Sequence, residues 1–199
     1  QPELAMLMTR EMGKPLTEAE GEVAKSAWVC DFYADHAEGM LADLPVPTEA
    51  RDSHVRFDPL GVVLAVMPWN FPFWQVFRFG APALAAGNVL LIKHAPNTQG
   101  CAAAIAGLAL EAGLPAGVLG NFPIRVDQVP AAIAHPAVAA VTLTGSDRAG
   151  RAVASAAGQA LKKSVLELGG SDPFVVLADA DLDAAVAQGV RSRTLKSGQ

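Results

Sequence analysis

Residues 61–72 read GVVLAVMPWNFP, and the apolar run over 61–66 sets the pattern on which the fold depends. Further runs of this kind follow at 88–93, 118–124, 138–143 and 163–168. Helical patterns separate them, near 73–86, 98–112, 127–134 and 146–158. Short apolar runs are typical of parallel strands buried on both faces, and the helices between them serve as crossovers. The sequence therefore predicts an α/β fold with a doubly wound, mostly parallel sheet.

Two helices are expected ahead of this sheet. The first ends at Gly13, because glycine closes helices in the left-handed conformation. Thr17 and Glu20 form a capping-box pattern, which predicts the start of a second, longer helix. The face that this helix is expected to bury carries Val23, Ala27, Cys30, Ala34 and Leu41.

Two other segments interrupt or extend the sheet pattern. Residues 43–59 are polar and contain prolines, and the alternation over 54–57 predicts a half-exposed strand of an appended hairpin. Beyond the fifth apolar run, residues 173–177 predict a further strand that leads into a helix from Asp181.

Composition narrows the class of protein. With 51% hydrophobic and 18% charged residues, the chain can bury one substantial core. A net charge of −5 and a pI near 5.3 do not suit a nucleic-acid partner. The longest uncharged apolar runs, 61–68 and 101–110, are shorter than the roughly 20 residues that span a bilayer, so we expect a soluble protein. Cys30 and Cys101 lie in alanine-rich helical stretches without metal-ligand spacing, which favours reduced core thiols in a cytoplasmic protein.

Ligands of such sheets bind outside the carboxyl ends of the strands, so the residues there are the candidates for chemistry. Asn70 lies between two prolines after the first strand, where a rigid amide can stabilise an oxyanion or simply make turn hydrogen bonds. Lys93 ends the second strand, where its ammonium can meet a ribose or a phosphate, although a solvated lysine fits the pattern as well. His94 beside it is more typical of a surface residue than of a ligand or base.

Two more strand ends carry candidates. Gly145 and Ser146 open a helix within a Gly-x-x-x-x-Gly turn, whose free N–H groups suit a pyrophosphate. The turn matches neither the usual dinucleotide fingerprint nor a complete phosphate loop, and Ser146 also suits a helix cap. Glu167 ends the fifth strand before two glycines. A partly desolvated carboxylate there suits a general base, whereas a lone glutamate more commonly faces solvent.

Taken together and in this order, these motifs closely resemble the aldehyde dehydrogenase superfamily. The resemblance rests on Pro68-Trp69-Asn70-Phe71-Pro72, Lys93, Thr144-Gly145-Ser146 and Glu167-Leu168-Gly169-Gly170, with Glu11-Met12-Gly13-Lys14-Pro15-Leu16 near the start. It covers nearly the whole chain. It implies a Rossmann-like domain that binds NAD or NADP, and a reaction in which a cysteine thiolate attacks an aldehyde and water hydrolyses the resulting thioester.

The resemblance also implies a role for each motif. Asn70 would donate to the oxyanion, and Glu167 would activate the hydrolytic water. On the cofactor side, Lys93 and Pro96 would border the adenine ribose, Gly145 and Ser146 would lie along the pyrophosphate, and Trp69 and Leu168 would approach through their backbones. No metal is implied.

The substrate and the cofactor are less closely specified. Residues 69–75 and 93–97 look most like those of bacterial succinate-semialdehyde dehydrogenases. Arg78 occupies a position at which semialdehyde-oxidising relatives place an arginine for the distal carboxylate, although a solvated helix arginine fits equally. NAD-selective members often carry a glutamate where this chain has Pro96, so NAD and NADP both remain open.

The resemblance further divides the chain into leading helices (1–42), a partial oligomerisation hairpin (43–60) and an NAD(P)-binding domain (61–199). Gln1 is not a methionine, and Ser197-Gly198-Gln199 matches the start of the family's Gly-Gln-x-Cys motif. We therefore expect an internal fragment that lacks the nucleophile and the catalytic domain, from a protein that forms homo-oligomers. A non-catalytic relative of the same fold and a reductase of acyl phosphates or acyl thioesters are the alternatives. Asn70 and Glu167 argue against the first, and Glu167 against the second.

Overall fold

The computed structural model describes residues 2–195, and its centre is a parallel sheet of five strands in the order β5-β4-β3-β6-β7. The strands are β3 (Val62–Val66), β4 (Val89–Lys93), β5 (Leu119–Asn121), β6 (Val138–Thr144) and β7 (Lys163–Glu167). The predicted doubly wound α/β fold is confirmed. The strand order reverses between β3 and β6, which makes their carboxyl ends the switch point at which such sheets bind ligands.

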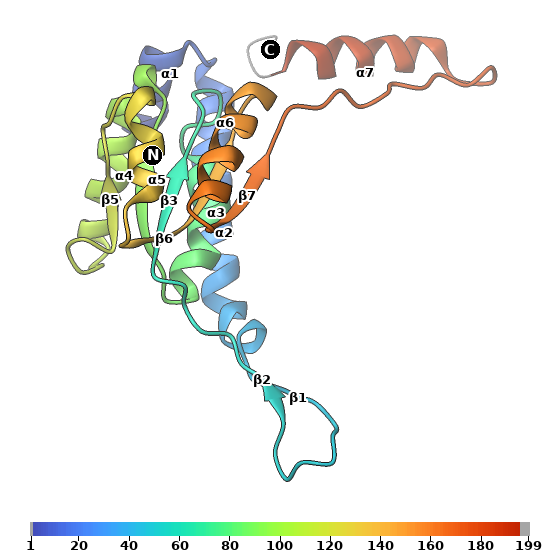
Figure 1. The fold of residues 1–199 in the computed structure, drawn as a ribbon. Helices are drawn as coiled ribbons and strands as arrows, with labels where there is room; N and C mark the ends of the chain where they lie inside the picture. Colours follow the sequence, from blue (N-terminus) through green and yellow to red (C-terminus); the bar gives the residue numbers. More distant parts are fainter. Residues whose placement is uncertain (1, 196–199) are drawn as a thin grey trace.

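Crossover helices cover both faces of the sheet (Figure 1). They are α3 (Trp74–Ala85), α4 (Gln99–Glu111), α5 (Val129–Ala134) and α6 (Asp147–Gln159), with short 3-10 turns η1 (Pro96–Thr98) and η2 (Val126–Gln128) before α4 and α5. These bounds agree with the sequence expectation to within about two residues, except that β5 is shorter than the predicted strand over 118–124.

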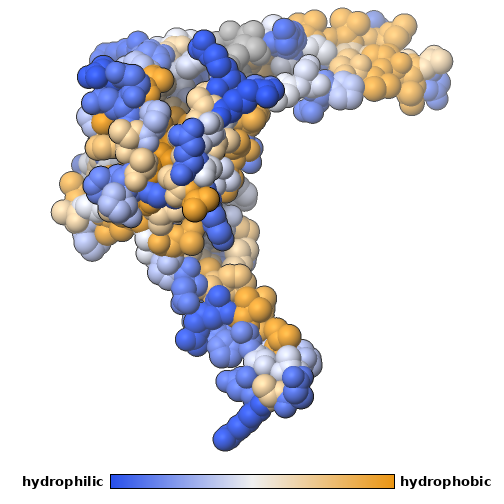
Figure 2. Space-filling model, in the orientation of Figure 1, coloured by the Kyte–Doolittle hydropathy of each residue, from blue (hydrophilic) through white to orange (hydrophobic). Residues whose placement is uncertain are grey.

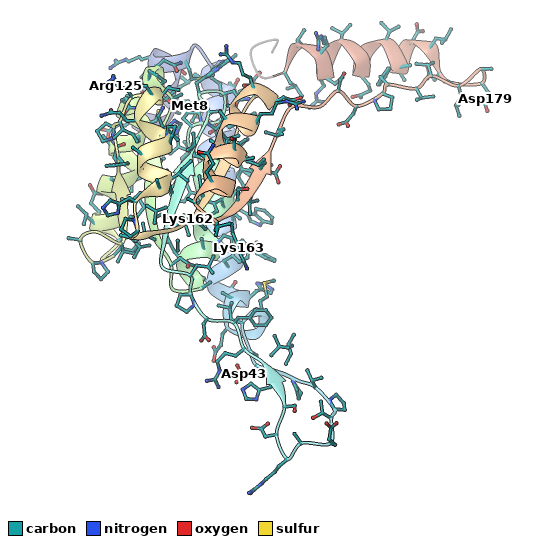
Figure 3. The ribbon with its side chains drawn as sticks, in the orientation of Figure 1. Met8, Asp43, Arg125, Lys162, Lys163 and Asp179 are labelled. Carbon is teal, nitrogen blue, oxygen red and sulfur yellow. The ribbon has the colours of Figure 1, made fainter. Side chains whose placement is uncertain are left out.

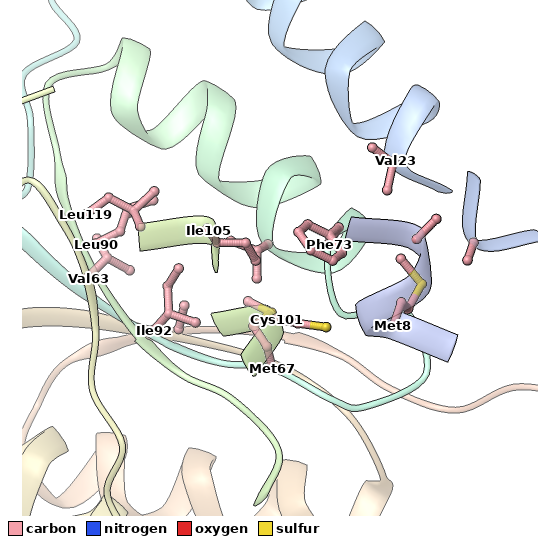
Figure 4. Packing of buried hydrophobic residues seen from close by; sticks show 14 of the residues in the cluster. Met8, Val23, Val63, Met67, Phe73, Leu90, Ile92, Cys101, Ile105 and Leu119 are labelled. Atoms are coloured by element: carbon pink, nitrogen blue, oxygen red, sulfur yellow. The ribbon is translucent and has the colours of Figure 1, made fainter. Parts of the chain in front are cut away.

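The larger of two core clusters fills the face covered by α3, α4 and the leading helices α1 (Pro2–Met12) and α2 (Leu16–Met40). Figure 4 shows this packing, in which Phe73 and Cys101 lie beside Met8 of α1. The second cluster lies on the opposite face and joins the sheet to α5 and α6. Since α1 contributes fully buried residues to the first cluster, the leading helices belong to the same core as the sheet.

The predicted start of the second helix is wrong, and among the residues of its predicted buried face only Val23 lies in the core. Helix α2 begins at Leu16 after Pro15, and no side chain caps it, so Thr17 and Glu20 form no capping box. Proline, with its fixed backbone angle, starts the helix earlier and leaves Thr17 inside the first turn. The face that packs on the core carries Ala19, Glu22, Val23, Ser26 and Val29, whereas Ala27 and Ala34 are exposed. Because the buried face includes the polar residues Glu22 and Ser26, an apolar pattern could not identify it.

An antiparallel pair of short strands, β1 (Leu44–Pro45) and β2 (His54–Val55), forms the expected hairpin. It projects from the foot of the molecule, where Asp43 is labelled in Figure 3. Asp43 forms an ion pair with Arg56 at 2.8 Å, and the hydrogen bond from the guanidinium lowers the pKa of the carboxyl group. Every residue of the two strands is exposed.

The strand predicted at 173–177 is wrong for the described residues. After β7 the chain leaves the sheet as an extended arm, in which Phe174, Val175 and Leu177 are each more than 60% exposed. The arm then returns as helix α7 (Leu182–Thr194), which begins after Asp181 as expected (Figure 1). The side chain of Asp181 caps it by accepting from the N–H of Ala184. Figure 2 shows hydrophobic residues gathered on this arm and helix. The sequence pattern suits a strand, but no strand of the described residues lies beside it.

Among residues 2–195, no helix combines the length and the apolar character that a membrane span requires.

Candidate active site

Three adjacent strand ends open into one cleft. Asn70 follows β3, Gly145 follows β6 and Glu167 ends β7, and all three residues line a hollow of about 600 Å³. The cleft is partly polar, and it also contains Trp69, Ser146 and Leu168. The structure therefore brings six of the nine predicted site residues into one place, at the carboxyl edge of the sheet.

The two candidate catalytic side chains differ in exposure. Asn70 is half-buried, whereas the side chain of Glu167 is 56% exposed, so the partly desolvated carboxylate considered from the sequence is not present. Arg78 of α3, the candidate substrate residue, faces this carboxylate with Nη1 3.5 Å from Oε2 of Glu167. A pair this exposed is weak, and water or an anionic ligand can replace either partner.

The glycine turn is connected to both neighbouring strands. The N–H of Gly145 donates to the carbonyl of Glu167 at 3.0 Å and extends the β6–β7 pairing into the turn. The hydroxyl of Ser146 accepts from the N–H of Ala149 at 3.3 Å and caps α6, as the structural interpretation of this serine predicted. Gly150 brings α6 close to the exposed Leu168 side chain, since a Cβ atom there would lie 2.6 Å from Cδ2 of Leu168.

Lys93 and His94 are buried, in contrast to the solvated lysine and surface histidine that sequence reasoning considered typical. Nζ of Lys93 donates to the carbonyl of His94 at 3.0 Å, and burial lowers the pKa of the ammonium group. The ring of His94 accepts from the N–H of Ala95 at Nδ1, which leaves Nε2 to donate to the carbonyl of Pro72 at 2.9 Å. Burial is also the main cause that lowers the pKa of His94.

An apolar groove lies beside Lys93, between α5 and α6, and sequence reasoning missed it. Its lining comes from the ends of β3 and β6 and from both helices: Val66, Val126, Val129, Pro130, Ile133, Leu143, Ala149, Ala152, Val153 and Ala156. Alanines such as those of α6 are good helix formers and indicate close packing rather than a binding surface. The signal for the groove was the spacing of Ala149, Ala152 and Ala156, which lie on one helix face directly after the glycine turn.

A further hollow, the rim pocket, is smaller than the cleft, continues from Lys93 to the outer edge and contains Pro96 and Arg125. Arg125 forms an ion pair with Asp127 at 3.1 Å. Figure 3 shows Arg125 at the carboxyl edge of the sheet, whereas Lys162 and Lys163 lie at the other edge, near the start of β7. Sequence reasoning did not single out Arg125, because its place beside Lys93 depends on the neighbouring strands.

Neither cysteine lines the cleft. Cys101 is fully buried in the core and Cys30 is half-buried on α2, and burial is the main cause that raises the pKa of both thiols. Ser197, Gly198 and Gln199, which precede the expected nucleophile, lie outside the described residues. Among residues 2–195 no cluster of three or more histidine, cysteine or acidic side chains is arranged to hold a metal ion.

Comparison with known proteins agrees with this arrangement. The profile of the aldehyde dehydrogenase family matches residues 1–199. The NAD(P)+ succinate semialdehyde dehydrogenase Sad of Escherichia coli K12 is 52% identical over 197 residues, which are 99% of this chain and 43% of that protein. A probable NADP(+) succinate-semialdehyde dehydrogenase of Synechocystis is 55% identical, again over 99% of this chain and 43% of its own length.

A crystal structure of succinic semialdehyde dehydrogenase from Streptococcus pyogenes, in complex with NADP+, superimposes with a TM-score of 0.95 and 43% identity. It covers 100% of this chain, which spans 44% of that protein. The chain therefore corresponds to less than half of the relatives that it matches. The profile, the sequence identities and the superposition show that the chain belongs to the aldehyde dehydrogenase family.

Proposed function

We propose that this chain is the cofactor-binding part of an enzyme that oxidises succinate semialdehyde to the carboxylic acid with NAD+ or NADP+. The observation that carries the proposal is that Asn70 and Glu167 line one cleft together with the Gly145 turn. The relatives that bear the name succinate-semialdehyde dehydrogenase support the choice of substrate, and their printed cofactors support NAD(P)+.

The surfaces beside the cleft fit a dinucleotide. The apolar groove between α5 and α6 suits a flat adenine ring, and Lys93 at its side suits the ribose hydroxyls. Pro96 borders the rim pocket without a carboxylate that would repel a 2′-phosphate, so both cofactors are retained in the proposal. The pyrophosphate would lie along Gly145 and Ser146 at the start of α6, and the nicotinamide would pass the backbones of Trp69 and Leu168. When bound, this cofactor accepts the hydride of the aldehyde.

The two catalytic candidates act on successive steps of the proposed reaction. A cysteine thiolate adds to the aldehyde carbon, and the side-chain amide of Asn70 donates to the oxyanion that forms on the carbonyl oxygen. Loss of hydride from that carbon leaves a thioester. Glu167 then takes a proton from the water that attacks the thioester, which releases the carboxylic acid and the thiolate.

The thiolate in this scheme comes from outside the described residues, because Cys101 is fully buried and neither Cys101 nor Cys30 lines the cleft. We accordingly assign residues 1–42 to leading helices, 43–60 to part of an oligomerisation hairpin and 61–199 to the cofactor domain. The exposed hairpin supports a homo-oligomer as the assembled form. Residues 1–199 alone would bind the cofactor without turnover.

Steady-state assays with succinate semialdehyde and each cofactor test the proposal on the full-length protein. We expect turnover by the full-length protein and none by residues 1–199. Asn70→Ala should lower kcat by about 10²–10³-fold, the usual effect of removing one oxyanion donor. Glu167→Gln should form thioester in a burst of reduced cofactor and then stall, because hydrolysis loses its base. Turnover by residues 1–199 alone, or full activity in both variants, would contradict the assignment.

Arg78 is proposed to bind the distal carboxylate of the substrate, because its guanidinium already contacts one carboxylate at the cleft, that of Glu167. In the full-length protein, Arg78→Ala should raise KM for succinate semialdehyde by about 10-fold or more, as expected for the loss of a charge-assisted contact. KM for an uncharged aldehyde of the same length should change little. Equal changes for the two substrates would exclude this role.

A further inference from the structure

Glu22 of α2 is a buried carboxylate whose contacts converge on the segment after Asn70. Its Oε1 accepts from the N–H of Phe73 at 2.9 Å and from the N–H of Trp74 at 3.0 Å. Its Oε2 forms an ion pair with Lys14, and both side chains are 1% exposed. One carboxylate from a distant helix thus satisfies two of the N–H groups that the first turn of α3 leaves free.

Two other side chains hold the same segment. Nζ of Lys14 lies 3.7 Å from the centre of the Phe71 ring. Nε2 of His94 donates to the carbonyl of Pro72. Phe73 is itself anchored, because its ring is 1% exposed and lies in the core between α1 and α4, as Figure 4 shows. Four consecutive residues, 71–74, therefore have their backbone or their rings fixed by groups from outside the segment.

A structural role alone accounts poorly for this arrangement. A buried ion pair is seldom more stable than an apolar pair of similar shape, since both charges lose their hydration. What an apolar pair cannot supply is an acceptor for the N–H groups of Phe73 and Trp74. The carboxylate also lies at the positive end of the α3 dipole, which strengthens its contact with these two donors.

We infer that Glu22, held by Lys14, is a positioning residue for Asn70: it fixes the first turn of α3 and so sets where the amide of Asn70 meets the developing oxyanion. This inference rests on the proposed function. A donor to an oxyanion must be placed to within a few tenths of an ångström, and Asn70 is separated by only two residues from the nearer N–H that Glu22 binds.

The test uses two double variants of the full-length protein, Lys14→Met/Glu22→Gln and Lys14→Met/Glu22→Leu. Both remove the two charges together, so neither leaves an unpaired buried ion. They differ in one respect, since only glutamine presents an oxygen to Phe73 and Trp74. The exposed Glu20→Gln on the same helix is the control for loss of a carboxylate from α2.

Amide hydrogen exchange reports how firmly residues 71–74 are held, and it needs no substrate. The amides of Phe71 and of residues 73–76 should exchange at least about 10-fold faster in the leucine variant, because the two hydrogen bonds are lost. They should stay near the wild-type rate in the glutamine variant and in Glu20→Gln. Equal exchange in the leucine and glutamine variants would overturn the inference.

Steady-state kinetics measure the effect of this segment on catalysis by Asn70. The leucine variant should lose about 10-fold or more in kcat, up to the loss caused by Asn70→Ala, with KM and the Kd of NADP+ nearly unchanged. The glutamine variant should restore most of kcat. In the Asn70→Ala background the leucine variant should cause no further loss, because both changes remove the same contact. A full additional loss would overturn positioning through Asn70. A wild-type protein without aldehyde oxidation would contradict the proposed function, and the exchange result would still decide whether Glu22 holds the segment.

Discussion

The two walls of the cleft differ in the number of contacts that hold them in place. The wall that carries Asn70 is backed by α1, α2 and α4, and its loop is held by Glu22 and His94 through direct hydrogen bonds. The wall that carries Glu167 is the end of an edge strand, where the carboxylate has one exposed contact, to Arg78. Leu168 and the segment after it are exposed as well.

This difference shows which part of the site the chain determines by itself. The position of Asn70 follows from contacts with buried residues of α2 and of the loop after β4, so it is set when the sheet folds. The position of Glu167 rests on fewer contacts, because β7 and the apolar arm that follows it are largely exposed. We therefore expect substitutions at the Asn70 wall to lower the free energy of unfolding more than substitutions at the Glu167 wall.

Two glycines near the starts of crossover helices allow a matched test of this difference. A Cβ atom at Gly100 would lie 2.7 Å from Oε1 of Glu11, and one at Gly150 would lie 2.6 Å from Cδ2 of Leu168. Glu11 cannot turn away freely, because its carboxylate accepts from the N–H groups of Gly100 and Cys101. Gly100→Ala should therefore destabilise the chain by about 1–3 kcal/mol, the usual effect of overpacking.

Gly150→Ala should change stability by less than about 1 kcal/mol, because the exposed Leu168 side chain can rotate and alanine favours the helix. Urea unfolding of residues 1–199 measures both values. The contrast between the walls would be lost if the Gly150 variant were destabilised as much as the Gly100 variant.

Most of the fold was predictable, because the pattern that specifies it is local. Each sheet strand is a short apolar run and each crossover has helical spacing, so the order of elements and the strand ends could be found without tertiary information. Asn70, Gly145 and Glu167 were candidates for the same reason, since each lies at or shortly after the end of a strand.

What could not be predicted depends on contacts between distant residues. Glu22 is 51 positions from Phe73, and a single glutamate on a helix usually faces solvent. His94 is buried under the loop that carries Pro72, a contact between segments 22 positions apart. Its own neighbours in the sequence do not reveal that contact, so a surface position was expected. The strand at 173–177 failed for the converse reason, since its pattern was right but a strand also needs a partner.

The last and smallest effect concerns pH at the rigid wall, where His94 holds Pro72 as a neutral ring. Burial, aided by Lys93, lowers the pKa of this ring below its ordinary value of 6.5, although its bond to Pro72 and the charge of Glu11 act in the opposite direction. The unfolded chain then binds more protons than the folded chain between the folded pKa and 6.5. The contribution of His94 to stability is thus complete above 6.5 and is lost as the pH falls toward the folded value.

Unfolding free energies measured at about pH 7.5 and about pH 5.5 should show this loss. His94→Gln keeps a donor for Pro72 but does not titrate, so its stability should fall less over the same range. His135→Gln, at an exposed histidine whose ring accepts from the N–H of Ala137, should behave as the wild type does. Identical pH dependence in the wild type and His94→Gln would show that protonation of His94 does not weaken the rigid wall. In that case the wall that carries Asn70 would be stabilised by Glu22 and the core around Phe73, independently of the charge on His94.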